Sequence, residues 1–202
     1  MATHNVACIV LAAGGSKRFG ARKQLENLAG ESLAHRAVRA AVKCNPAIVV
    51  VVLGADAEKV QTSVSDYASI EIVINDNWQS GLSSSIAAGL RAVENRTNVD
   101  GILITLADQP LVDSSCLRRL LDKFDNDNRI VASAYHGAVG VPAVIGIEHI
   151  HELMNLSGDR GAGSWLKQRL ASVIAVPMPE AATDIDTPQD LERLRSELGH
   201  DV

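Results

Sequence analysis

The stretch Ile-Val-Val-Val-Val-Leu, residues 48–53, is an unbroken run of apolar and mostly β-branched residues. Because polar and apolar residues do not alternate in it, the run predicts a strand that is buried on both faces. Three other short apolar runs predict further strands: Val6–Ala12, Ile70–Ile74 and Gly101–Leu106. Strands of this kind are typical of a parallel sheet that is covered by helices.

Amphipathic segments separate these strands and predict helices at residues 32–43, 57–67, 83–94 and 114–124. We expect serines to cap the third helix and Asp113 to begin the fourth. The rest of the chain predicts strands at 130–134, 141–145 and 173–176, and helices at 148–156 and 164–170. A last helix is expected from Pro188, with Thr187 as its N-cap. The alternation predicts one α/β domain over residues 1–202, with a mostly parallel sheet.

Composition argues against several classes of protein. The net charge of -5 over 202 residues leaves no basic excess for binding nucleic acid. No apolar run has the length needed to span a membrane, and the amino terminus lacks the basic region of a signal peptide. Cys8, Cys44 and Cys116 show no paired spacing, which favours reduced thiols over disulfides. We therefore expect a cytoplasmic protein that binds neither nucleic acid nor a membrane.

The segment after the first strand, residues 11–23, combines small residues with cations in the order L-A-A-G-G-S-K-R-F-G-A-R-K. Glycines allow backbone N–H groups to form an anion-binding concavity. The cations are Lys17, Arg18, Arg22 and Lys23. Together they predict a polyphosphate site, and the alternative is a strand-to-helix turn with a solvated basic rim. The spacing fits neither the Walker A loop nor G-x-G-x-x-G, which disfavours P-loop kinases and dinucleotide dehydrogenases.

Carboxylates are found at two further points. Asp108 follows the fourth predicted strand, so we expect it to face the same crevice as the glycine-rich loop. Asp184 and Asp186 alternate along an extended segment and therefore share one side. Mg2+ prefers one or two carboxylates together with phosphate oxygens and waters, which makes Asp108 a candidate ligand. The alternatives are a turn residue before Pro110 and, for the later pair, electrostatic stabilisation of a helix N-terminus.

Three motifs resemble those of a known family. They are L-A-A-G-x-S-x-R-x-G-x-x-K at 11–23, L-A-D-Q-P at 106–110 and D-I-D-T-P-x-D-L at 184–191. All three are similar to hallmarks of the MobA-like nucleotidyltransferases, and the resemblance spans nearly the whole chain. It implies a three-layer Rossmann-like fold, that of the nucleotide-diphospho-sugar transferases. It also implies an enzyme that transfers a nucleotide and releases pyrophosphate.

The resemblance implies roles for individual residues. Arg18 and Lys23 match cations that neutralise the α-phosphate and the departing pyrophosphate, so these two and Asp108 are the candidate catalytic residues. Asp108 and Asp186 match the positions that hold Mg2+ against the nucleotide phosphates, whereas Asp184 is not placed among the ligands. The candidate nucleotide-binding residues are Leu11, Ala12, Ala13, Gly14, Gly15, Gly81, Ser84 and Ser85.

Further segments resemble the cytidylyl branch of the family. Residues 75–85 contain N-x-x-x-x-x-G-x-x-x-S, which contacts base and ribose in that branch. The G-D-x-G-A motif at 158–162 and the G-x-P motif at 140–142 match its acceptor side, where Arg160 could meet a phosphate or remain solvated. Ala13 stands where guanylyl enzymes typically carry glycine. The resemblance thus implies CTP as donor, the molybdopterin cofactor as acceptor and a molybdenum hydroxylase as partner.

Other interpretations stay open. The same chemistry could use GTP, or a sugar phosphate as acceptor, and a non-catalytic carrier could bind molybdopterin for a hydroxylase. The presence of two cations and two carboxylates in the family positions favours catalysis, because a carrier would not need all four. His149 and His151 are two residues apart and would not share a helix face, so we do not predict a zinc pair. We also expect no role for His136.

Overall fold

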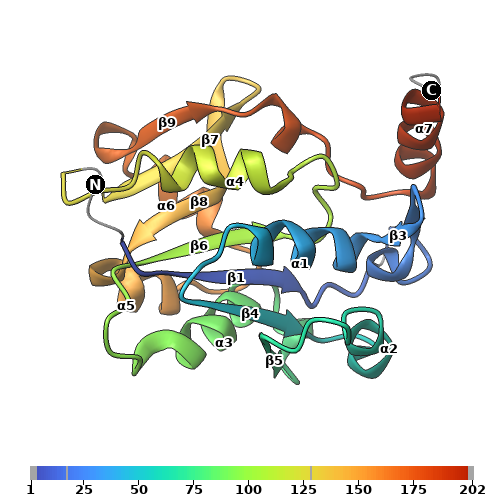
Figure 1. The fold of residues 1–202 in the computed structure, drawn as a ribbon, viewed down its shortest axis with the longest axis horizontal. Helices are drawn as coiled ribbons and strands as arrows, with labels where there is room; N and C mark the ends of the chain where they lie inside the picture. The colour runs from blue at the N-terminus through green and yellow to red at the C-terminus, as the bar shows by residue number, and fades with distance from the viewer. Residues whose placement is uncertain (1–3, 17, 128, 200–202) are drawn as a thin grey trace.

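The computed structural model describes residues 4–16, 18–127 and 129–199. Seven strands form one sheet in the order β5-β4-β1-β6-β8-β7-β9 (Figure 1). Their bounds are β1 Val6–Ala12, β4 Ile48–Leu53, β5 Ile70–Ile74, β6 Gly101–Leu106, β7 Ile130–Tyr135, β8 Ala138–Gly146 and β9 Ile174–Pro177. Neighbouring strands from β5 to β6 are parallel, as are β7 and β9, whereas β8 is antiparallel to both β6 and β7. The predicted mostly parallel sheet is confirmed.

Helices cover both faces of this sheet. Their bounds are α1 Leu33–Lys43, α2 Ala57–Thr62, α3 Leu82–Glu94, α4 Ser114–Leu121, α5 Ile150–Met154, α6 Ala162–Lys167 and α7 Pro188–Gly199. Side chains alternate along β1, so Cys8 and Val10 share an apolar layer with α1, α2 and α4, while Ile9 shares one with α3, α5 and α6. The result is the three-layer arrangement that the family resemblance implies. In the described part of the chain no helix is both long and apolar enough to cross a membrane.

Local sequence signals locate most of these elements. The four strands expected in the first half have the predicted bounds, and Asp113 caps α4 by accepting from the N–H groups of Ser115 and Cys116. The helix expected at 57–67 ends earlier, at Thr62. The sequence does not predict the short ribbon of β2 (Asn27–Leu28) and β3 (Glu31–Ser32), because two-residue strands are too short for a periodic pattern.

The expected serine cap of α3 is wrong. Gly81 occupies the N-cap position with a φ of +106°, a left-handed conformation that favours glycine, and no side chain in the described part of the chain caps the helix. Ser83 instead donates its N–H and its hydroxyl to the carbonyl of Gly158, at 3.1 and 2.7 Å. The serine-rich sequence therefore attaches the start of α3 to a distant loop, residues 157–161.

The sheet topology brings the motif-bearing segments together. The chain leaves β1 for β4 and β5 on one side and then returns to β6 on the other, so the loops that follow Ala12 and Leu106 are neighbours at the carboxyl edge. The C-terminal segment joins them, because the N–H of Ile185 donates to the carbonyl of Asp108 at 2.9 Å. Ile185 also packs in a small apolar cluster with Leu191 of α7.

Candidate active site

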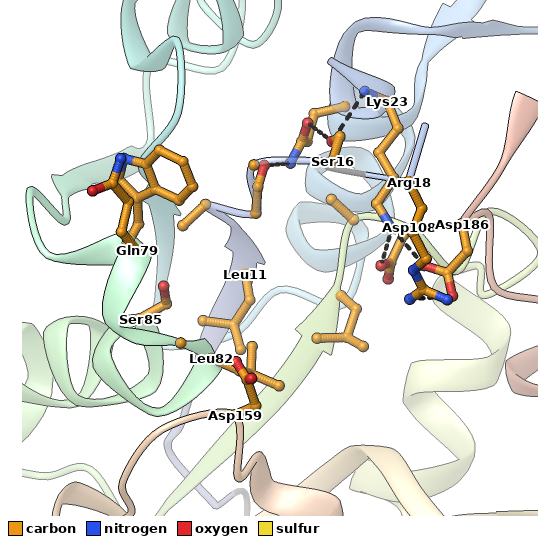
Figure 2. Close-up of a pocket in the computed structure, with 18 residues that line it drawn as sticks. Leu11, Ser16, Arg18, Lys23, Gln79, Leu82, Ser85, Asp108, Asp159 and Asp186 are labelled. Atoms are coloured by element: carbon orange, nitrogen blue, oxygen red, sulfur yellow. Dashed lines mark hydrogen bonds and ion pairs between the residues drawn. The ribbon is translucent and has the colours of Figure 1, made fainter. Parts of the chain in front are cut away.

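A cavity of about 400 Å³ opens at this carboxyl edge. It is lined by Leu11, Ala13, Gly14, Gly15, Ser16, Arg18, Lys23, Gln24, Trp78, Gln79, Gly81, Leu82, Ser85, Leu106, Ala107, Asp108, Asp159 and Asp186. Figure 2 shows a charged end, where Arg18 and Lys23 meet the two aspartates, and a less charged end around Leu82 and Ser85. The charged end is therefore formed by three parts of the chain that are far apart in sequence: residues 18–23, Asp108 and Asp186.

Most of the predicted site residues line this cavity, but two do not. Ala12 is 2% exposed and belongs to the apolar layer on the α1 side of the sheet. Ser84 donates its hydroxyl to the carbonyl of Gly81 at 2.8 Å and accepts from the Asn75 amide at 2.9 Å. Both residues support the wall from behind. The loop cation Lys17 lies outside the described residues.

Polar side chains hold the glycine-rich loop in shape. The Gln24 amide donates to the carbonyl of Gly14 at 2.7 Å, and Arg22 donates to the carbonyl of Gly15 at 2.6 Å. Arg22 also forms an ion pair with Asp56, so its guanidinium is bound both to the loop and to the residue before α2. Carbonyl oxygens that would repel an anion are thus bound to donors, which favours a loop that accepts a phosphate chain.

Lys23 is the centre of the charged end. Its Nζ lies 2.7 Å from Asp108 Oδ2, 3.2 Å from Asp186 Oδ1 and 2.8 Å from the carbonyl oxygen of Ile185. The side chain is only 11% exposed. Burial lowers the pKa of Lys23, but the charges of Asp108 and Asp186 and their hydrogen bonds more than offset it and raise the pKa above its ordinary value. Lys23 is therefore a buried cation.

The two predicted metal ligands approach each other through this lysine. Arg18, on the exposed side of the cavity, forms an ion pair with Asp186 at a distance of 2.8 Å. Asp108 Oδ1 is buried and has no hydrogen-bond partner among the described residues, so the carboxylate keeps one oxygen available. No cluster of three or more His, Cys, Asp or Glu side chains suited to a metal occurs in the described residues. The donor set fits a cation held by two carboxylates and completed by substrate phosphates, the mode that Mg2+ prefers.

Asp184 lies close to the charged end. Its side chain is exposed, yet partial desolvation and the nearby charges of Asp108 and Asp186 raise its pKa to about 6, although Gln109 and the charge of Lys23 oppose the shift. It does not line the cavity, unlike its neighbour Asp186. The sequence-based choice of Asp186 over Asp184 as a candidate ligand agrees with this placement.

The 157–161 loop contributes a residue that the sequence analysis did not select. Asp159 lines the cavity, whereas Arg160 does not. A Cβ built on Gly81 would lie 2.8 Å from Asp159 Oδ1, so the aspartate is held against the start of α3. Figure 2 shows its carboxylate below Leu11 and Leu82. The acidic position of the G-D-x-G-A motif was the signal available in the sequence.

His149 and His151 do not line the cavity. His149 is close to Glu148 and Glu152 and packs edge-on against Trp165, while His151 faces Glu94 on α3. These two histidines therefore have separate surroundings.

Comparisons with known proteins agree with this geometry. The family model of the MobA-like NTP transferase domain matches residues 8–173. That match includes the glycine-rich loop and Asp108 and ends before Asp186. Its description refers to transfer from a nucleoside triphosphate, the class of reaction that a polyphosphate-binding cavity serves.

Two relatives and one solved structure match nearly the full chain. Nicotine blue oxidoreductase of Paenarthrobacter nicotinovorans is 31% identical over 201 residues, 94% of this chain and 96% of that protein. The purine catabolism protein PucB of Bacillus subtilis is 26% identical and covers 93% of this chain and 94% of its own length. Rv0371c of Mycobacterium tuberculosis, solved in complex with manganese, superposes with a TM-score of 0.75 at 26% identity, over 95% of this chain and 98% of that one.

Proposed function

Because this chain belongs to the MobA-like NTP transferase domain family and is a nucleotidyltransferase, we propose that it transfers CMP from CTP to the molybdopterin cofactor. We further propose that the reaction requires Mg2+ and releases pyrophosphate. The observation that carries the proposal is the convergence of Arg18 and Lys23, from the glycine-rich loop, with Asp108 and Asp186 in one cavity. We also propose that residues 1–202 form a single nucleotidyltransferase domain.

The chemistry follows from positioning and charge. A phosphate oxygen of the acceptor attacks the α-phosphorus of CTP, the new P–O bond forms, and the bond to the β-phosphate oxygen breaks. The bonding electrons leave with pyrophosphate. An acceptor phosphate is already ionised at neutral pH, so the reaction needs no dedicated general base. In-line alignment and stabilisation of phosphoryl charge then account for the rate.

Individual residues have distinct tasks in this proposal. Arg18 and Lys23 neutralise charge on the α-phosphate and on the leaving pyrophosphate. Asp108 and Asp186 would hold Mg2+, which when bound supplies a Lewis acid for the phosphate oxygens. Manganese in the Rv0371c structure supports a divalent ion in a relative, and Mg2+ is our proposal for this chain.

The lining of the cavity bears on the choice of nucleotide. Ala13, Gly81 and Ser85 line the cavity, as the cytidylyl resemblance implies. Ala13 is the residue that departs from the guanylyl pattern. This supports CTP over GTP. We propose that the enzyme is cytoplasmic, since Cys8, Cys44 and Cys116 are all free thiols. We also propose that its dinucleotide product serves a molybdenum hydroxylase.

Four alternatives stand beside the proposal. GTP or a sugar phosphate could replace CTP or the acceptor, and a carrier could bind molybdopterin without turnover. The name of the Paenarthrobacter relative adds a redox reaction, favoured by 31% identity over nearly the whole chain. The carboxylate pair around a buried lysine favours transfer, because a hydride acceptor would not need two metal-binding carboxylates.

The decisive experiment measures pyrophosphate release with Mg2+ and molybdenum-loaded molybdopterin, using CTP, GTP and ATP in parallel. We expect release with CTP. Release with GTP alone would reverse the choice of nucleotide, and tight binding of CTP without release would favour the carrier. A parallel assay follows NADPH oxidation at 340 nm with a dye acceptor, and turnover there without pyrophosphate release would favour the redox alternative.

A further inference from the structure

The ammonium group of Lys23 is fully coordinated by oxygen atoms of the protein itself. A lysine ammonium has three N–H donors, and all three have an acceptor here: one oxygen each from Asp108, Asp186 and the carbonyl of Ile185. These acceptors are hard oxygen atoms, the ligand type that Mg2+ and Mn2+ bind. Lys23 thus has the surroundings of a small cation.

The four directly paired side chains balance one another in charge. Asp108 and Asp186 carry two negative charges, and Lys23 and Arg18 supply two positive ones at short range. A free divalent ion that entered this cluster would add two positive charges beside Lys23 and Arg18 in a partly buried place, an excess that the nearby Asp184 carboxyl alone would not offset. The phosphates of a nucleoside triphosphate would remove that excess, and they are also the groups that could draw Lys23 away from the aspartates.

We propose that Lys23 occupies the metal position in the free enzyme and exchanges its carboxylate partners for nucleotide phosphates when the metal–nucleotide complex binds. The inference rests on the proposed function for the location of the metal. It makes Lys23 an exchangeable counter-ion as well as a phosphate-binding residue. The free protein should consequently bind divalent ions poorly, and nucleotide should raise its affinity for them.

The test measures Mn2+ binding to the full chain by the loss of the free-ion electron paramagnetic resonance signal, with no nucleotide present. Lys23→Met removes the competing ammonium, and we expect it to bind Mn2+ at least about tenfold more tightly than the wild type. Lys59→Met is the matched control, because Lys59 is 71% exposed and pairs with Asp56 away from the cluster. It should bind like the wild type.

Two further measurements keep the test decisive. Adding Asp108→Asn to Lys23→Met should abolish the gained affinity, and adding CTP to the wild type should raise its Mn2+ affinity toward that of Lys23→Met. Lys23→Gln replaces the methionine variant if circular dichroism shows that the latter does not fold. Equal Mn2+ affinity of wild type and Lys23 variants without nucleotide would overturn the exchange. That result is separate from turnover, since failure of pyrophosphate release would remove the proposed reaction and leave the Mn2+ comparison intact.

Discussion

The indole of Trp78 lies directly against Gly15, so that a Cβ at residue 15 would stand 2.8 Å from Trp78 Cη2. Gly15→Ala must therefore displace the ring or the glycine-rich loop. Because Gly15 lines the cavity, we expect the KM for the nucleotide to rise about tenfold, in keeping with an overpacking cost of ~1–3 kcal/mol. Steady-state kinetics of pyrophosphate release would measure it.

The control for this prediction is the neighbouring glycine. Among the described residues, a Cβ on Gly14 would meet only the Gln24 amide nitrogen at 3.6 Å, an ordinary contact, so Gly14→Ala should raise the KM for the nucleotide less. Combining Gly15→Ala with Trp78→Ala should restore the KM to that of Trp78→Ala alone. Equal effects of Gly15→Ala in both backgrounds would rule out the steric explanation.

Gln109, from the L-A-D-Q-P motif, joins two segments behind the cavity. It is 3% exposed, and its amide donates to the carbonyls of Ala181 at 2.9 Å and Val141 at 3.2 Å. Gln109→Leu leaves these carbonyls without that donor, so we expect a loss of ~1–3 kcal/mol in the free energy of unfolding. Urea denaturation followed by circular dichroism measures it. The exposed Gln61→Leu should change stability by less than about 0.5 kcal/mol, and a similarly small effect at Gln109 would contradict the prediction.

Asp113 gives the protein a pH-dependent helix cap. Burial raises its pKa, but hydrogen bonds from Ser115 and Cys116 outweigh this and hold the pKa below its ordinary value. The cap therefore stabilises above the unfolded pKa of about 3.9 and loses its effect as the pH falls through the lower folded value. We expect Asp113→Ala to cost ~0.5–2 kcal/mol near pH 7 and less below pH ~4. Asp113→Asn keeps the cap and should lack this pH dependence; a constant difference between wild type and the alanine variant would refute the argument.

Asp184 should act in the opposite sense. Its folded pKa of about 6 lies above the unfolded value, so stability is fully present below pH ~3.9 and is lost as the pH rises through 6. Asp184→Asn resembles the protonated form and should raise the melting temperature at pH 8 but not at pH 4. Thermal scans are made in EDTA, so that no metal contributes. Asp76→Asn, at another exposed carboxyl, is the control, and a shift equal at both pH values would argue against a raised pKa at Asp184.

The sequence predicts the parts of this protein that depend on local signals. The apolar run at Ile48–Leu53 specifies a strand by itself. The L-A-A-G sequence, whose first two residues end β1, locates the loop. Asp113 is recognisable as a cap because a helix N-cap involves only the next three residues.

Long-range contacts escape such reasoning. The partners of Lys23 lie 85 and 163 residues away, and the sequence analysis placed this lysine on phosphates rather than among the aspartates. Arg160 is the more conspicuous residue of its loop, yet Asp159 lines the cavity, because loop orientation is set by the contact of Gly158 with Ser83. The cap prediction for α3 was wrong for a similar reason, because Ser83 donates its hydrogen bonds to the distant Gly158 carbonyl.

The carbonyl of Gly158, which accepts two hydrogen bonds from Ser83, has a consequence for how this protein can evolve. It fixes the loop that carries Asp159 to the helix that carries Ser85, so neither can be remodelled without disturbing the other. Substitutions in the two segments should therefore show epistasis. Under the proposed function, a descendant that acquires a new second substrate through this loop would inherit a changed nucleotide pocket with it, and the two specificities would evolve as one coupled trait.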